Sequence, residues 1–197
     1  MTPKQQERIK SKIKRIKADL AADKKHWGGY YHDGHGLRYL PLRFYIQIED
    51  YGGGLRYLNW FNKNFPDDAG FPGFLFEWTI ILFKSGRLEE AKKKAFETFC
   101  RNTYLFDKFF GRQIRPIEKW EGSNLEIADF AIGHFDYSDA QENLADFSKW
   151  LNLFTSSEKF IDLSNKYIEI HIRLKSEHDF ETRHFLMQQT DQLGKEI

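Results

Sequence analysis

Two short bends that contain glycine, each followed by an amphipathic stretch, constrain the fold of this chain more than any other feature. The first bend lies in residues 50–55 and the second in residues 86–91. Gly54 and Ala91 take the same place in the two segments, 37 residues apart. A small residue at such a place lets two packed helices approach closely, whereas a large side chain would push them apart. The pattern therefore predicts two consecutive helical hairpins.

The N-terminal segment has the signals of a helix start. Thr2 is suited to cap the first turn, Pro3 fits the first helical position, and Gln5 stands where a capping box needs it. Four apolar residues then recur at spacings of four, three and four, which places them on one side of a helix: Ile9, Ile13, Ile16 and Leu20. The four glycines between residues 26 and 36 predict that a loop follows.

The two hairpins are expected between residues 37 and 105. In the first, residues 51–54 mark the turn between two short helices, and Pro66 follows the end of the second helix. In the second hairpin, helices over residues 74–84 and 88–100 are joined at Ser85 and Gly86. Gly86 suits the left-handed backbone position that closes a helix.

After residue 101 the pattern is less regular. We expect a connector over residues 102–120 with at most one short helix. Serine-led capping boxes at residues 123–126 and 138–141 predict two further helix starts. The last helix is expected over residues 179–193, with Gly194 as its stop.

The segment from residue 155 to residue 174 fits two structures. The alternation of Ile168, Ile170, Ile172 and Leu174 with polar residues is typical of a strand. A different set fits one side of a helix: Phe160, Leu163, Tyr167, Ile170 and Leu174. We favour the helix, because a lone strand is unstable and no partner strand is evident.

The bulk properties fit one globular, all-α domain over residues 1–197. Its expected parts are a basic N-terminal helix (1–25), the two hairpins (37–105) and the C-terminal helices (116–197). A hydrophobic fraction of 41% is enough for a sizeable core. The net charge of +1 gives the whole protein no attraction for nucleic acid or a membrane surface.

Cysteine content and apolar runs indicate the cellular setting. A single cysteine, Cys100, excludes an internal disulfide and does not suggest a secreted scaffold. Residues 1–17 are polar and basic, unlike a signal peptide. The longest apolar run, residues 74–83, is shorter than the roughly 20 residues that span a bilayer. We therefore expect a cytoplasmic location.

The hairpin pattern resembles the tetratricopeptide repeat (TPR) family, whose unit is a helix-turn-helix of about 34 residues. The positions that match in the first unit are Tyr45, Gly54, Leu58, Phe61 and Pro66, and those in the second are Leu75, Trp78, Leu82, residues 86–91 and Ala95. The spacing between the two units is about three residues longer than in the family. The closing proline of the second unit is missing, and Thr103 stands near its place. A third, degenerate unit is expected over residues 129–150, with Ala140 in the small-residue position.

The resemblance implies stacked antiparallel hairpins in an α-α superhelix, whose first helices line a concave peptide-binding groove. The residues that would face this groove are Tyr39, Arg43, Gln47, Phe76, Ile80 and Lys84. The expected function is a non-enzymatic scaffold that binds a protein or peptide partner. As an alternative, the C-terminal helices fill the groove as ordinary core. A homodimer formed through an apolar groove face is a further alternative.

Histidine and aspartate in the glycine-rich loop offer another alternative function, a metal-dependent enzyme, which ranks below binding of nucleic acid. The residues are His26, His32, Asp33 and His35, whose side chains suit zinc or nickel. Their spacing matches no ligand signature, so we expect no metal site and no cofactor. Cys100 is expected to be a small buried hydrophobe. No catalytic motif is present, and we expect no catalytic residues.

The N-terminal helix supports the first alternative to the scaffold function, binding of nucleic acid. Residues 4–25 contain nine Lys or Arg and three acidic residues. Such a helix could contact phosphates through Lys12, Lys14, Arg15 and Lys17. No aromatic residue is interleaved with these charges to stack on bases, so a solvated outer face of a capping helix is favoured.

Overall fold

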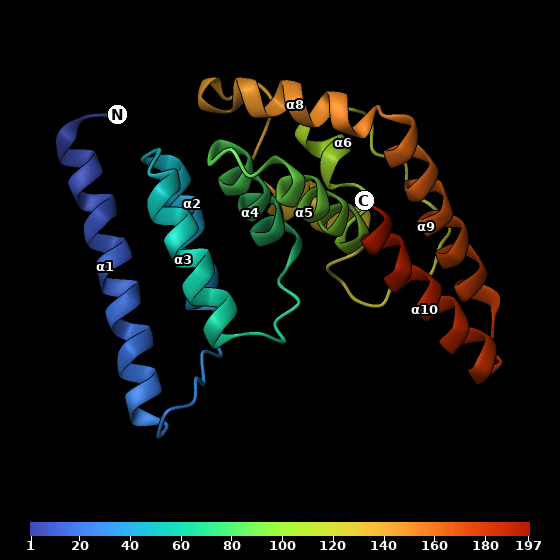
Figure 1. The fold of residues 1–197 in the computed structure, drawn as a ribbon, viewed down its shortest axis with the longest axis horizontal. Helices are drawn as coiled ribbons and strands as arrows, with labels where there is room; N and C mark the ends of the chain where they lie inside the picture. The colour runs from blue at the N-terminus through green and yellow to red at the C-terminus, as the bar shows by residue number, and fades with distance from the viewer. The chain divides into compact units, whose positions relative to one another are not determined.

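The protein is entirely helical. The computed structural model describes residues 1–197 and contains ten α-helices, two short 3-10 helices and no strand (Figure 1). The all-α prediction is confirmed. So is the helical structure of residues 167–174, which lie within one long helix. None of the helices combines the length and the apolar character needed to cross a bilayer.

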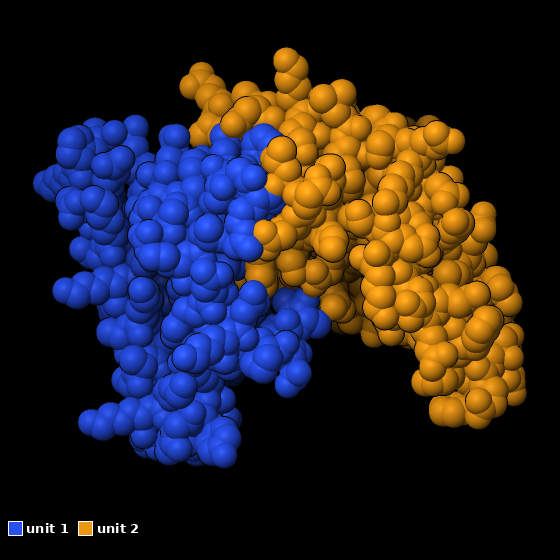
Figure 2. Space-filling model, in the orientation of Figure 1, with its two compact units in different colours: residues 1–70, 80–87 blue, residues 71–79, 88–197 orange.

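The chain divides into two compact units, which Figure 2 shows in different colours. Unit 1 comprises residues 1–70 and 80–87, and unit 2 comprises residues 71–79 and 88–197. The single domain expected from the sequence stays a prediction.

Unit 1 begins with the longest helix, α1 (Pro3–His26). It continues with the 3-10 helix η1 (Leu37–Tyr39), α2 (Pro41–Gln47) and α3 (Tyr51–Asn64). The last residues of α4 (Pro72–Lys84) complete it. α1 lies against η1 and α2, and α2 packs on α3.

The start of α1 follows the predicted capping box. The Thr2 side chain accepts a hydrogen bond from the Gln5 amide at 3.3 Å, and the Gln5 side chain accepts one from the Thr2 amide at 2.7 Å. These bonds satisfy two donors that a helix start would otherwise leave open. The predicted apolar stripe of α1 is buried: Ile9, Ile13, Ile16 and Leu20.

The first bend lies a few residues before its predicted place. The chain turns at residues 48–50, where Glu49 has a left-handed backbone with φ of 56°. Gly52, Gly53 and Gly54 belong to the first turn of α3 rather than to the bend. Asp50 starts this helix, because its carboxylate accepts a hydrogen bond from the Gly53 amide at 2.8 Å.

Close packing explains two of these glycines. A Cβ atom on Gly53 would lie 2.6 Å from Tyr45 Cε1 on α2, and one on Gly54 would lie 2.5 Å from Ile81 Cδ1 on α4. The close approach within the hairpin, which the sequence assigned to Gly54, is therefore made by Gly53. Gly54 instead serves the contact between α3 and the end of α4.

The second bend lies where the sequence predicted it. α4 ends at Lys84, and Gly86 takes the left-handed conformation with φ of 75°. The amide of Arg87 donates to the Leu82 carbonyl oxygen at 3.0 Å, which satisfies a carbonyl at the end of the helix.

Unit 2 contains the first part of α4 and six further helices. These are α5 (Leu88–Arg101), α6 (Leu105–Phe109), α7 (Ala128–His134), α8 (Ala145–Thr155), α9 (Glu158–Ser176) and α10 (Phe180–Glu196), with the 3-10 helix η2 (Glu142–Leu144) before α8. Thr79 on α4 lies 3.4 Å from Thr98 on α5, hydroxyl to hydroxyl. The connector with one short helix is confirmed by α6.

Phenylalanine dominates the core of unit 2. The ring of Phe76 lies fully buried at the centre of five other rings, whose centroids are between 4.8 and 6.3 Å away: Phe106, Phe109, Phe135, Tyr137 and Phe147. Aromatic pairs at such separations stabilise a core beyond the apolar area that they bury.

Three predicted helix limits in unit 2 are wrong. The box at residues 123–126 forms a turn, with Ser123 Oγ accepting from the Leu125 amide at 3.3 Å, and α7 begins only at residue 128. The box at 138–141 leads first into η2 and then into α8. Gly194 lies inside α10, which runs on to residue 196.

The third repeat unit expected over residues 129–150 does not take the form of a simple hairpin. Residues 135–141 lie outside any helix, between α7 and η2. Ala140 is exposed in this segment, so it does not mediate a close helix contact. No superhelical repeat is established by these elements.

Candidate functional site

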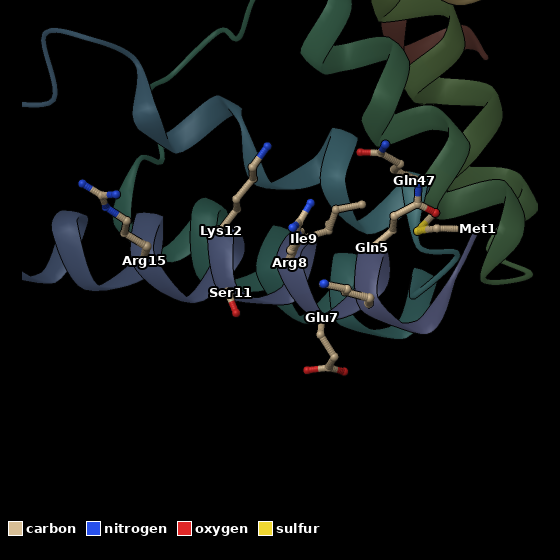
Figure 3. A pocket seen from close by; sticks show the side chains of 10 residues that line it. Met1, Gln5, Glu7, Arg8, Ile9, Ser11, Lys12, Arg15 and Gln47 are labelled. Carbon is tan, nitrogen blue, oxygen red and sulfur yellow. The ribbon is translucent and has the colours of Figure 1, made fainter.

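A shallow hollow lies beside the first half of α1 in unit 1. Its volume is about 1010 Å³, and ten residues line it (Figure 3). Nine of them come from residues 1–15, and Gln47 at the end of α2 contributes the tenth. Small-molecule pockets have volumes of roughly 300–1,000 Å³, so the hollow lies at the upper end of this range.

Four cationic side chains line this hollow. Lys4, Arg8, Lys12 and Arg15 follow one another at spacings of four, four and three, so they share one side of α1. All four residues are exposed. Lys12 Nζ lies 5.6 Å from the centre of the Phe44 ring on α2.

Few acidic groups offset these charges. Glu7 is the one acidic residue of the lining, and its carboxylate is already bound to Lys10 Nζ at 2.9 Å. Arg15 lies 3.9 Å from Asp19, at the limit of an ion pair. Figure 3 shows Glu7 and Ser11 pointing away from Gln47, whereas Lys12 points toward the side of α2. The hollow is therefore a cationic site with room for an anionic group.

The floor and rim of the hollow are less polar. Ile9 belongs to the buried stripe of α1 and is only 7% exposed. Met1 lies beside Gln5 at the N-terminal end, close to the capping box (Figure 3). The long carbon stems of lysine and arginine add further apolar surface below their charged ends. The site can thus contact both apolar and anionic parts of a ligand.

Of the six residues predicted to face a groove, three belong to the first helix pair. Gln47 lines the hollow, and Arg43 is exposed one turn earlier on α2. Tyr39 lies outside α2, in η1, and is half-buried. Its hydroxyl donates to the Asp68 carboxylate at 2.7 Å, so Tyr39 is part of an internal polar cluster.

The other three predicted groove residues lie on α4. Phe76 and Ile80 have no exposed surface, so neither can touch a partner in this structure. Phe76 instead lies at the centre of the core of unit 2. Lys84 is half-buried, and its ammonium lies 5.5 Å from the centre of the Tyr51 ring. The alternative that protein side chains fill this region agrees with the burial of Phe76 and Ile80.

The internal polar cluster joins the loop after α1 to the loop after α3. Arg38 donates from Nε to Asp68 at 2.7 Å and from Nη1 to Asp33 at 3.1 Å. Tyr57 donates to the Arg38 carbonyl oxygen at 2.7 Å. The cluster is structural rather than accessible, because the side chain of Asp33 is only 3% exposed and that of Asp68 only 12%.

Burial and hydrogen bonds shift the pKa values of two members of this cluster, Asp68 and Tyr39. Burial alone would raise the pKa of Asp68, but hydrogen bonds from Tyr39, Gly70 and Arg38 lower it below its ordinary value. Burial, and then the hydrogen bond to Asp68, raise the pKa of Tyr39 to about 12. Tyr39 therefore remains a neutral donor and Asp68 a charged acceptor near neutral pH.

The glycine-rich loop does not assemble its candidate metal ligands. Both oxygens of Asp33 are engaged, by the amides of Leu37 and Arg38 at 2.8 and 2.9 Å. The His32 ring packs against Trp27, with ring centres 4.9 Å apart. No three His, Cys, Asp or Glu side chains are grouped so that they could hold a metal ion.

Cys100 is more accessible than expected. It is partly exposed rather than fully buried, because it lies near the end of α5 in the wall of a second cavity. Burial of the thiol nevertheless raises its pKa above the ordinary value. The group is therefore a thiol near neutral pH and a poor nucleophile.

The hollow is not predicted by the sequence analysis, although one signal for it is present in the sequence. Lys4, Arg8, Lys12 and Arg15 recur at spacings of four, four and three, which places them in one stripe along a helix. Only the fold, however, places Gln47 beside it.

No protein-family model, no curated protein and no solved structure matches this chain.

Proposed function

We propose that the chain is a non-enzymatic helical scaffold that binds an acidic segment of a partner protein in the hollow beside α1. The observation that supports the proposal most is the cationic stripe of Lys4, Arg8, Lys12 and Arg15 above an apolar floor. Opposite charges steer encounter and fix the register of such a complex, while apolar contacts add to its affinity. A segment that alternates acidic and apolar residues matches both features.

The lining of the hollow favours a protein segment over nucleic acid, whereas charge alone does not separate the two. Unit 1 has 15 Lys or Arg and 8 acidic residues, a net charge of +7, whereas unit 2 has 15 and 21, a net charge of −6. Unit 1 therefore attracts anionic ligands of either class, and the lining of the hollow has to discriminate between them. None of the ten lining residues is aromatic, so the hollow offers no surface on which bases could stack.

The TPR resemblance is part of this proposal in a limited form. Two pairs of consecutive helices, α2 with α3 and α4 with α5, pack against each other, as helix-turn-helix units do. Helical repeat proteins commonly serve as binding scaffolds. The proposed site nevertheless differs from the concave groove of the family, since Gln47 is the one predicted groove residue that lines it.

Fluorescence anisotropy with two labelled probes tests the proposal. One probe is a synthetic 12-residue peptide of alternating glutamate and leucine, and the other is a 12-nucleotide poly-dT strand. We expect the peptide to bind more tightly than poly-dT, with an affinity that falls as NaCl rises from 50 to 300 mM. Absence of peptide binding would overturn the proposal, and tighter binding of poly-dT would support the nucleic-acid alternative instead.

Paired charge reversals locate the site. Arg8→Glu with Lys12→Glu changes two residues of the hollow, whereas Lys14→Glu with Lys17→Glu makes the same change in charge elsewhere on α1. All four residues are exposed, so both variants should fold. We expect the first variant to lose about tenfold or more in peptide affinity and the second to lose little. Equal losses would show general charge attraction and would refute the assignment to the hollow.

A further inference from the structure

Unit 2 contains a second cavity, unrelated to the hollow beside α1. Its volume is about 600 Å³, and its walls come from α5, α9, α10 and the segment around residues 120–126. This volume lies within the range of roughly 300–1,000 Å³ that is usual for small-molecule sites. Nothing in the proposed scaffold function requires a cavity at this place.

One wall contains a histidine whose hydrogen bonding is incomplete. His171 on α9 is only 3% exposed. Its Nδ1 atom lies 3.1 Å from the Trp120 carbonyl oxygen, while the Trp120 amide donates to the His171 carbonyl oxygen at 2.8 Å. A carbonyl oxygen only accepts, so Nδ1 must bear the proton.

The fixed tautomer leaves the other ring nitrogen as an acceptor. Nε2 of His171 is buried and has no hydrogen-bond partner in the protein. Burial lowers the pKa of His171, which keeps the ring neutral near pH 7. Buried acceptors without a partner are rare, and each calls for an explanation such as a bound molecule. A ligand with an N–H or O–H group would complete this ring.

Aromatic side chains pack around His171 at this side of the cavity. Tyr167 stacks on it with centres 4.1 Å apart, and Trp120 lies 5.6 Å away. The Tyr167 hydroxyl donates to the Cys100 carbonyl oxygen at 2.5 Å, and Phe96, which is almost fully buried, also lines the cavity. Aromatic side chains in a cavity favour an aromatic ligand, because aromatic pairs attract each other beyond the apolar area that they bury.

The charges around the cavity nearly balance. Glu97, Glu126 and Asp191 line it together with Lys93 and Arg101. Glu97 is bound to Lys94 at 2.6 Å, which leaves two carboxylates and two cations. Such a lining selects neither anions nor cations strongly. The selectivity of the cavity therefore depends on the planar shape of the ligand and on one hydrogen bond to His171.

We infer that this cavity is a binding site for a small, uncharged heteroaromatic molecule that donates a hydrogen bond to His171 Nε2. The aromatic side chains hold the body of the ligand, and its N–H group satisfies the buried nitrogen. Indole has both features and serves as the probe. 1-Methylindole has the same ring system but lacks the donor, so it is the matched control.

NMR titration of the protein with the two probes is the first test. We expect indole to bind about tenfold more tightly than 1-methylindole, the difference that one ordinary hydrogen bond makes. The ¹⁵N signal of His171 Nε2 should shift with indole and not with 1-methylindole. Equal affinities, or no binding of indole, would overturn the inference.

Variants provide the second test. His171→Phe keeps a flat ring but removes the acceptor, so it should abolish the preference for indole. Gly194→Phe places a ring at the cavity wall, whereas Gly133→Phe places one on α7 outside it. A Cβ atom added at either glycine would meet no other atom within 4 Å, so both variants should fold. Indole binding should be lost in Gly194→Phe and kept in Gly133→Phe, and equal binding in these two would refute the site.

Discussion

Replacing Gly54 by alanine tests the packing of α3 against α4. The new Cβ atom would lie 2.5 Å from Ile81 Cδ1 and 3.2 and 3.3 Å from two other carbons of the same side chain. Ile81 is fully buried and cannot move aside freely. Overpacking of this kind costs about 1–3 kcal/mol. The gain of about 0.5–1 kcal/mol from replacing glycine in a helix offsets part of this cost.

The net expectation is a loss of about 1 kcal/mol in the free energy of unfolding, near the middle of the range that these two terms allow. For a chain of this length, such a loss lowers Tm by about 2–4 °C. Urea unfolding followed by circular dichroism measures it. Gly52→Ala is the matched control, because its Cβ would meet only Arg56 Nη1 at 3.6 Å and an Asp50 carboxylate oxygen at 4.0 Å, both ordinary contacts. We expect this variant to be more stable than the wild type by about 0.5 kcal/mol.

A double variant connects the loss to one contact. Ile81→Val removes the Cδ1 atom that the new methyl group would strike, and alone it should cost about 0.5–1.5 kcal/mol. Combined with Gly54→Ala, the total loss should be smaller than the sum of the two single losses by about 1 kcal/mol. Additive losses, or a Gly54→Ala variant at least as stable as the wild type, would refute the packing argument.

Three further expectations concern single hydrogen-bonded residues. Asp68→Asn should lower the free energy of unfolding by about 1–3 kcal/mol near neutral pH. Because the pKa of Asp68 is lowered in the folded state, this difference should be present above about pH 4 and should disappear as the pH falls through the lowered pKa. Urea titrations of both proteins at several pH values measure it. Thr2→Ala should cost about 1 kcal/mol and speed hydrogen exchange of the Gln5 amide, which Thr2 caps. Tyr167→Phe removes the hydroxyl that donates to the Cys100 carbonyl oxygen and should lower the free energy of unfolding by about 1 kcal/mol. Stability unchanged in these variants would contradict each assignment.

Local signals predicted the helices of unit 1 and the second bend well. The capping box at Thr2 and the left-handed position of Gly86 depend only on neighbouring residues, and both were found where the sequence placed them. The glycines of α3 were misplaced for a related reason. Glycine favours turns in general, but here Asp50 caps the helix just before them and tertiary contacts require their small size.

The sites were harder to predict, because they depend on which surfaces the fold covers. The four-residue spacing of Phe76 and Ile80 fits an exposed helix face as well as a buried one. Only the rings that surround Phe76 decide between them. Likewise, nothing near His171 in the sequence reveals that Trp120, 51 positions earlier, fixes its tautomer. Contacts over such separations are invisible to local patterns.

The unequal charges of the two units have a consequence for handling the protein. A net charge of +1 for the whole chain would suggest weak retention on any ion exchanger at neutral pH. Unit 1, with +7, should nevertheless adsorb to a cation-exchange resin, and unit 2, with −6, to an anion-exchange resin. The same opposition should draw copies together in dilute buffer. Moderate salt should therefore raise solubility rather than precipitate the protein, because it screens attraction between molecules that are almost neutral as a whole.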